Sequence, residues 1–336
     1  MRRTRILAAA MTAAVAAGTA LAMVTAPSAF AVNTAFEVVF QANTGYLWAA
    51  GFAGTGNQGL GMLAGTSPSL TLYQNPGTTS YGYEAAINAN TGVLYVMGPA
   101  HTGFLGVAMM AGTNPAITAL NSGGYVVAVQ GSNGHLWVAS SGYSTDLGLP
   151  MRAGTSPAIT TYGTGYEIAY QGSNGDLWVY GTAGSGDQHV AMKAGTSPGI
   201  IWTVSTGGTA EAFQGSNGDL WMAGTLGSGD QHYAMNAGTN PAMTPVNGNN
   251  AYEIAWQGSD GNLWVKGTDA TGPLGLPIMA GTSPAITGLV NGGFETAYQG
   301  RNADLFFWGY VGDGDEGYGM KPGTNPALIP NPNPNG

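Results

Sequence analysis

Short runs of residues alternate between apolar and polar or small side chains along most of the chain. In residues 166–171, for example, the large apolar side chains of Tyr166, Ile168 and Tyr170 occupy every second position. A period of two predicts a strand with one face turned toward a core. Asn174-Gly175 follows and supplies the positive φ angles of a tight hairpin, and residues 177–180 predict the returning strand. The pattern therefore indicates a chain built from β-hairpins.

Two sequence markers repeat seven times in the same phase. The first is a Gly-Thr-Ser-Pro or Gly-Thr-Asn-Pro segment, whose copies begin at Gly65, Gly112, Gly154, Gly195, Gly238, Gly281 and Gly323. Successive copies lie 47, 42, 41, 43, 43 and 42 residues apart. The second marker is a segment of the form Gly-x-Leu-aromatic (Ala-x-Leu-aromatic in the last copy), which ends at Trp48, Tyr95, Trp137, Trp178, Trp221, Trp264 and Phe306. The chain is therefore an array of one structural unit.

The repeat length predicts the fold class. A unit of about 43 residues with three or four short strands is the size of one propeller blade. Glycine is too frequent between residues 45 and 323 for helices. A β-trefoil needs multiples of three, and a linear solenoid needs atypical end repeats, whereas the first and last copies here are ordinary. We predict an all-β, seven-bladed β-propeller over residues 32–328, followed by a flexible Asn/Pro tail at 329–336.

The first 31 residues have the pattern of an export signal. Arg2, Arg3 and Arg5 form a basic start, an Ala-rich apolar stretch follows, and Ala29-Phe30-Ala31 supplies the small residues of a cleavage site. The alternative is an uncleaved membrane anchor, which the Ala-dominated composition disfavours. We therefore expect residues 1–31 to be a signal peptide and the protein to be secreted and extracellular.

The charge balance argues against several partners. The chain has 8 basic and 17 acidic residues, and loss of the leader would leave a net charge of −12. Such a surface repels nucleic acid and anionic lipid, so neither nucleic-acid binding nor membrane insertion is expected.

Groups for catalysis or metal binding are sparse. Cysteine is absent, and the four histidines do not have metal-ligand spacing. Glutamates recur four residues before a strand-ending amide, at Glu37, Glu84, Glu167, Glu253 and Glu295, and are replaced at Val126 and Ala210. A glycosidase needs two carboxylates converging on one bond, which equal acids around a ring do not supply. We expect these glutamates to line the channel or bond to a neighbouring blade, and we predict no enzyme, no cofactor and no metal.

Two sets of repeated positions fit binding better. The first comprises the hairpin tryptophans Trp48, Trp137, Trp178, Trp221 and Trp264. An indole face can stack on the apolar side of a sugar ring, although these side chains could instead fill the gap between blades. The second set lies nine residues later in Gly-rich loops and comprises Asn57, Asp146, Asp187, Asp230 and Asp315, with Phe104 and Pro273 in the other copies. These acids and amides could hold sugar hydroxyls, or could form turn-stabilising Asx bonds.

The segments Phe-Gln-Ala-Asn-Thr-Gly-Tyr-Leu-Trp48 and Ala-Gly-Thr-Ser-Pro resemble repeats of secreted actinobacterial propeller lectins. That family includes the lectin subunit of the umbrella toxin particles of Streptomyces, and its repeat logic is similar to that of tachylectin-like propellers. The resemblance implies a glycan-binding chain, with adaptor or toxin subunits of a secreted antibacterial particle as partners. It assigns no sugar contact residue by residue.

The leading prediction is a non-catalytic lectin that binds cell-surface or extracellular glycans through repeated sites between blades. Many aromatic and amide side chains with few cations suit an uncharged polyol, and repeated weak sites gain avidity. The alternative is a protein-interaction scaffold, suggested by features unique to single blades such as Trp202, Trp256 and Phe306-Phe307-Trp308. A polysaccharide hydrolase is disfavoured because no carboxylate pair is evident.

Overall fold

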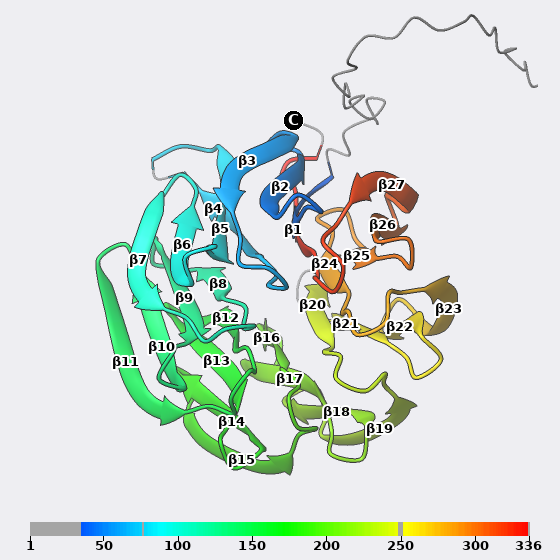
Figure 1. The fold of residues 1–336 in the computed structure, drawn as a ribbon. Coiled ribbons are helices and arrows are strands. Elements are labelled where there is room, and N and C mark those ends of the chain that lie inside the picture. The colour runs from blue at the N-terminus through cyan, green and yellow to red at the C-terminus, as the bar shows by residue number, and fades with distance from the viewer. Residues whose placement is uncertain (1–34, 76, 248–250, 335–336) are drawn as a thin grey trace, which may run out of the picture. The chain divides into compact units, whose positions relative to one another are not determined.

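The computed structural model describes residues 35–75, 77–247 and 251–334. These residues form seven antiparallel sheets of four strands each, arranged as blades around a central axis (Figure 1). The part of the chain that is described contains strands and turns but no helix. The predicted all-β, seven-bladed propeller is thus confirmed, and the predicted signal peptide lies outside the described residues.

The blades follow the chain, and the first strand of blades 2 to 7 lies nearest the axis (Figure 1). Blade 1 comprises β28 (Ala327–Pro330), β1 (Phe36–Gln41), β2 (Tyr46–Gly51) and β3 (Gly56–Gly61). Blade 2 comprises β4 (Ser69–Gln74), β5 (Tyr81–Asn88), β6 (Val93–Met97) and β7 (Gly103–Ala108). Blade 3 comprises β8 (Ala116–Ala119), β9 (Tyr125–Gln130), β10 (His135–Ser140) and β11 (Tyr143–Pro150). Blade 4 comprises β12 (Ala158–Tyr162), β13 (Gly165–Gln171), β14 (Asp176–Gly181) and β15 (Ser185–Ala191). Blade 5 comprises β16 (Gly199–Thr203), β17 (Gly208–Gln214), β18 (Asp219–Gly224) and β19 (Gly229–Ala234). Blade 6 comprises β20 (Ala242–Val246), β21 (Ala251–Gln257), β22 (Asn262–Gly267) and β23 (Thr271–Pro277). Blade 7 comprises β24 (Ala285–Gly288), β25 (Phe294–Gln299), β26 (Asp304–Gly309) and β27 (Asp313–Gly319).

Blade 1 closes the ring because its innermost strand comes from the other end of the chain. β28 pairs with β1, with Leu328 opposite Val38 and Pro330 opposite Phe36. β28 also contacts β24 and β4, the innermost strands of the blades on either side. The boundary predicted at residue 328 therefore falls inside the closing strand, which extends to Pro330.

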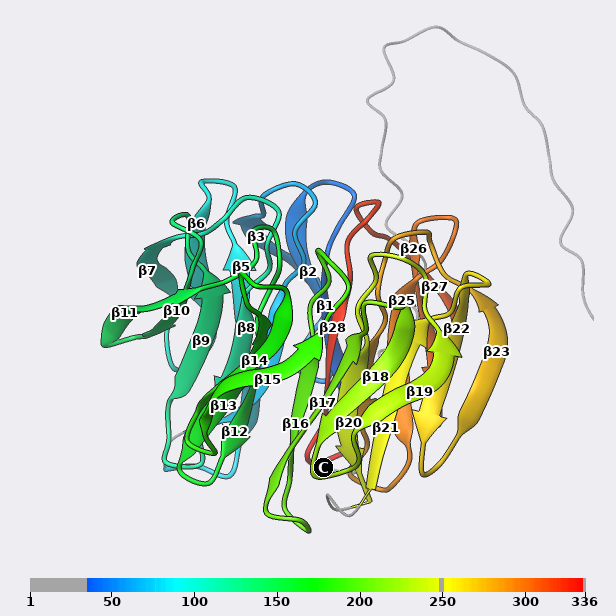
Figure 2. The ribbon, with the colours of Figure 1, turned by 90° about the horizontal axis from the view of Figure 1, so that it is seen from below.

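The hydrophobic core lies between the blades. One cluster, for example, joins Val126 and Leu136 of blade 3 to Ile168 and Tyr170 of blade 4. Each of the seven clusters combines two neighbouring blades in this way. A single blade cannot bury both faces of its sheet, so each blade depends on its neighbours. Figure 2 shows the blades edge-on, with their strands running between the two faces of the ring.

The Gly-Thr-Ser/Asn-Pro segments link the blades at one end of the channel. The backbone N–H of the Ser or Asn donates to the side-chain oxygen of the same position in the next blade, at 2.7 to 2.9 Å. The seven residues are Ser67, Asn114, Ser156, Ser197, Asn240, Ser283 and Asn325. Asn325 donates to Ser67 and so completes a circle of hydrogen bonds. This marker is therefore a device for closing the ring.

The repeated glutamates have a structural role, but their partner differs from the one expected. Glu37 Oε2 accepts the N–H of Ala53 at 2.8 Å, and Glu167 Oε2 accepts that of Ala183 at 2.7 Å. Both donors lie in the loop between the second and third strands of the same blade. These side chains are fully buried, the hydrogen bonds of Glu37 and Glu167 stay within their own blade, and none of the five glutamates is among the residues that line the channel mouth.

Candidate functional site

The two sets of predicted binding positions meet within each blade. Trp178 on β14 lies opposite Asp187 on β15, and the hairpin residue Asn174 connects them. Trp178 Nε1 donates to Asn174 Oδ1 at 3.1 Å, and Asn174 Nδ2 donates to Asp187 Oδ2 at 2.8 Å. Asp187 Oδ1 accepts the backbone N–H of His189 at 2.7 Å. Indole, amide and carboxylate therefore form one hydrogen-bonded chain at the outer edge of the blade.

The complete chain of bonds recurs in the two neighbouring blades. Blade 3 has Trp137, Asn133 and Asp146, and blade 5 has Trp221, Asn217 and Asp230. We call this set of three hydrogen-bonded side chains the Trp–Asn–Asp network, and blades 3, 4 and 5 each contain one.

The other blades keep parts of this arrangement. In blade 7, Asn302 donates to Asp315 at 2.9 Å, but Phe306 replaces the tryptophan. In blade 6, Trp264 donates to Asp260 at 3.0 Å, but Pro273 replaces the aspartate. In blade 1, Trp48 lies opposite Asn57, and its buried Nε1 has no hydrogen-bond partner among the described residues. In blade 2, Tyr95 lies opposite Phe104. The blades therefore differ in the chemistry of their outer edges.

The tryptophans also pack between blades. Trp178 is half-buried and packs against the cluster that joins blade 3 to blade 4. A Cβ added at Gly172 would lie 2.4 Å from Trp178 Cδ1, so the indole lies on a position that only glycine can occupy. The gap-filling alternative for the tryptophans is thus present in the structure. Sugar stacking on their exposed edges remains a prediction.

The aspartates stabilise a bulge in the outer strand. Asp146 Oδ1 accepts the N–H of Gly148 at 2.8 Å, and Asn57 Oδ1 accepts that of Gly59 at the same distance. The pKa of Asp146 is lowered, chiefly by the bond from Gly148. The turn-stabilising Asx bond is therefore observed, and the second carboxylate oxygen of Asp146, Oδ2, accepts the Asn133 amide.

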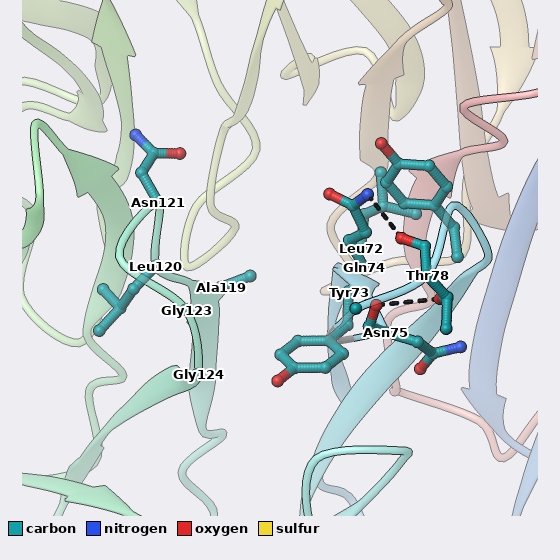
Figure 3. Close-up of a pocket in the computed structure, with 12 residues that line it drawn as sticks. Leu72, Tyr73, Gln74, Asn75, Thr78, Ala119, Leu120, Asn121, Gly123 and Gly124 are labelled. Carbon is teal, nitrogen blue, oxygen red and sulfur yellow. Dashed lines mark hydrogen bonds between the residues drawn. The ribbon is translucent and has the colours of Figure 1, made fainter.

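A separate cavity lies between blades 2 and 3 (Figure 3). It has a volume of about 460 Å³ and is walled by the β4–β5 loop on one side and the β8–β9 loop on the other. Tyr73, Gln74 and Thr78 line the blade 2 side, and Leu120 and Asn121 belong to the blade 3 side (Figure 3). The sequence held a signal for it, because the first interval between repeats is 47 residues rather than 41 to 43, and the extra residues lengthen the β4–β5 hairpin, mainly in its two strands.

A second cavity is the channel mouth at the opposite end of β4. It has a volume of about 320 Å³ and is lined by the Ser/Asn-Pro positions of all seven blades. The ring of hydrogen bonds already uses the side-chain oxygens of these Ser and Asn residues.

Groups for other chemistries are not assembled in the described part of the chain. No three His, Asp or Glu side chains there are placed to hold a metal ion. The buried glutamates lie in separate blades, each against its own loop. Within the same residues, no helix has the length and apolar character needed to cross a membrane.

The solved structures to which this chain is similar include lectins. The chain is similar to the fungal lectin of Aleuria aurantia, described as a six-bladed β-propeller with a novel fucose recognition mode, at 13% identity and a TM-score of 0.56. The match covers 76% of this chain and 96% of that one. It is also similar to the BP39L lectin from Burkholderia pseudomallei, at 15% identity and a TM-score of 0.61, covering 86% and 100% of the two chains. AofleA from Arthrobotrys oligospora matches at 13% identity and a TM-score of 0.54, covering 80% and 90%. No protein-family model and no curated protein matches in sequence. At these identities the structural likeness establishes a shared propeller fold.

Proposed function

We propose that this protein is a secreted, non-catalytic lectin that binds neutral glycans. The observation that carries the proposal is the chemistry of the cavity between blades 2 and 3. Its walls hold amides, a hydroxyl, tyrosines and glycine backbone, and no charged side chain. Its volume falls in the range of small-ligand sites, and an uncharged lining of hydrogen-bonding groups beside aromatic rings matches a sugar.

The fold and the repeats add support. The Aleuria aurantia lectin, which has a similar fold, has been solved with α-methyl-L-fucoside. We therefore include fucosylated glycans among the candidate ligands. We also retain Trp48, Trp137, Trp178, Trp221, Trp264, Asn57, Asp146, Asp187, Asp230 and Asp315 as proposed contacts of the repeated sites. Repetition of weak sites on one rigid ring would raise avidity for a densely glycosylated surface.

A glycan array tests the proposal. The purified protein should bind a subset of neutral glycans, and a clean array at high protein concentration would contradict lectin function. Gln74→Leu should weaken binding at the cavity by about tenfold, because one hydrogen bond to a ligand is lost. The matched control is Gln58→Leu on β3, which lies outside the cavity lining and should leave binding unchanged.

Two finer proposals depend on cellular context. Export rests on the leader pattern of residues 1–31 and is tested by the N-terminal sequence of protein from culture medium. The proposal that the protein is the target-binding subunit of a secreted toxin particle rests on the resemblance of its repeats to those of secreted actinobacterial propeller lectins. Co-purification of stoichiometric partner subunits from native culture medium would support it, and a lone chain would contradict it.

One observation favours the scaffold alternative. Val290, Tyr310 and Val311 of blade 7 are 56%, 63% and 47% exposed and lie beside a cavity of about 210 Å³. Exposed apolar side chains that gather in one place are typical of protein-binding surfaces. If this surface binds a partner, Tyr310→Ser should abolish co-purification and leave glycan binding intact.

A further inference from the structure

Three of the chain's four histidines lie beside the aspartate of a Trp–Asn–Asp network. Nδ1 lies 3.2 Å from Asp146 in His135, 3.7 Å from Asp187 in His189, and 3.6 Å from Asp230 in His232. The three blades concerned, 3 to 5, are consecutive and are those with the complete network. Each complete Trp–Asn–Asp network, in blades 3, 4 and 5, therefore has an imidazole beside its aspartate.

The histidines reach this place from two different sequence positions. His135 lies on β10, two residues before the tryptophan, whereas His189 and His232 lie on the outer strands, two residues after the aspartate. Blades 4 and 5 carry Asp176 and Asp219 where blade 3 has His135. Copying of one blade would explain the likeness of blades 4 and 5, but it does not explain the imidazole in blade 3.

The backbone of blades 4 and 5 is strained to accommodate these side chains. His189 and His232 have φ angles of 56° and 60°. The same bulge position holds glycine in the other five blades, with φ between 64° and 73°, at Gly59, Gly106, Gly148, Gly275 and Gly317. A left-handed backbone favours glycine, so histidine is an unfavourable choice there. Both histidine side chains are 85% exposed, so packing does not offset the strain.

A retained local strain at an exposed side chain points to a role in recognition. The imidazole offers a ring face and nitrogen atoms, the adjacent carboxylate accepts hydrogen bonds, and the half-buried indole lies opposite that aspartate on the neighbouring strand. A neutral sugar presents the complementary groups, an apolar C–H face and hydroxyl donors on neighbouring carbons. We propose that His135, His189 and His232, with their partner aspartates, form three sugar sites on the outer edges of blades 3, 4 and 5.

This inference rests on the proposed lectin function and specifies which of the repeated sites bind sugar. Blades 1 and 7 have the polar outer-strand residue but no adjacent histidine, and blades 2 and 6 replace that residue by Phe104 and Pro273. Three of the seven blades would therefore bind through the outer edge. These sites are separate from the cavity between blades 2 and 3.

The four imidazoles allow a direct test by NMR. The Cε1–H signals are assigned by single substitutions and followed while α-methyl-L-fucoside, α-methyl-D-mannoside, N-acetyl-D-glucosamine and any array-positive sugar are added. The signals of His135, His189 and His232 should shift and saturate with the binding sugar. His101, which is not beside such an aspartate, is the internal control and should not move.

Glycine substitutions separate binding from stability. The double variant His189→Gly/His232→Gly restores the residue of the other blades, so it should melt at a higher temperature and yet bind immobilised glycan at least about tenfold more weakly, through lost avidity. Ala303→Gly is the matched control. Ala303 has φ of 68° at a hairpin position where the other six blades have glycine. It should also raise the melting temperature, with glycan binding unchanged.

The outcomes distinguish the two proposals. If the wild type binds sugar but the three imidazole signals stay fixed and the double variant binds normally, the histidine sites are refuted and the lectin function stands. If the wild type binds no glycan by array or NMR, the lectin function fails, and the histidine sites fail with it.

Discussion

Replacement of Glu37 by glutamine tests how the propeller holds its buried carboxyl groups. Glu37 is fully buried, Oε2 accepts one backbone N–H, and Oε1 has no partner among the described residues. Burial raises the pKa of Glu37 to about 8, against the opposing bond from Ala53. The side chain is therefore protonated in the folded protein at neutral pH, whereas in the unfolded chain it ionises near its ordinary pKa of 4.5.

The sign of the pH dependence follows from that difference. Below a pH of about 4.5 the side chain is protonated in both the folded and the unfolded state, so its ionisation does not lower the unfolding free energy. As the pH rises toward 8, the unfolded chain gains the free energy of ionisation and the folded state does not, so the unfolding free energy falls. One pKa unit corresponds to about 1.36 kcal/mol, so the loss from this one residue reaches about 5 kcal/mol at most. Burial also raises the pKa of Glu84, Glu211, Glu253 and Glu295 to about 7, so the wild type should be more stable at pH 5 than at pH 8.

Glutamine at position 37 keeps an oxygen for the Ala53 N–H and removes the titrating proton. The variant should lose stability between pH 5 and pH 8 less steeply than the wild type, by up to about 1.4 kcal/mol per pH unit. Urea unfolding followed by tryptophan fluorescence at pH 5, 6, 7 and 8 measures the slope. Asp260→Asn is the matched control, because the lowered pKa of Asp260 keeps it ionised throughout this range. Equal slopes for Glu37→Gln and the wild type would refute the assignment of a protonated buried carboxyl.

The remaining predictions concern the ring and the turns. Ser156→Ala removes one link of the hydrogen-bonded circle and orphans a backbone N–H, which should cost about 1 to 3 kcal/mol in urea unfolding. Gly172→Ala places a Cβ 2.4 Å from Trp178 and should lower the unfolding free energy by about 1 to 3 kcal/mol or more. Gly142 has open space around it, so the control Gly142→Ala should change the unfolding free energy by at most about 0.5 kcal/mol. Deletion of residues 327–336 removes β28 and leaves β1 without its inner neighbour, so calorimetry should show a broadened or multi-step transition, and a single sharp transition would contradict closure by β28.

The fold was predictable from sequence because repetition multiplies a weak signal. One run such as residues 166–171 predicts only a strand, but two markers in constant phase predict the same unit seven times. The closing partner was harder to predict, because the Asn/Pro composition near Pro330 is typical of a tail, while tertiary pairing with Phe36 makes those residues part of a sheet. Local composition carries no information about a partner nearly three hundred residues away.

The roles of the repeated residues could not be resolved by sequence alone. A tryptophan and an aspartate nine residues apart fit both sugar binding and internal bonding, and only the position of Asn174 between Trp178 and Asp187 shows how they connect. Likewise, Glu167 could have faced a neighbour, but the twist of the hairpin brings the N–H of Ala183 to its carboxylate. Hydrogen bonds of this kind depend on angles that a residue pattern does not contain.

Repetition also shows where recognition is to be sought. A residue present in all seven blades serves what all blades need, as the buried Thr66 and its equivalents do by bonding back across their own turns. A residue that differs from the other copies of the repeat is not required by the blade fold. Where such a residue also strains the backbone, its presence indicates a functional role. His189 meets both conditions, and the β4–β5 hairpin meets the first because it is longer than the hairpin of the other blades. The specificity of this propeller should therefore change when such departures are restored to the repeat, while its stability stays constant or rises.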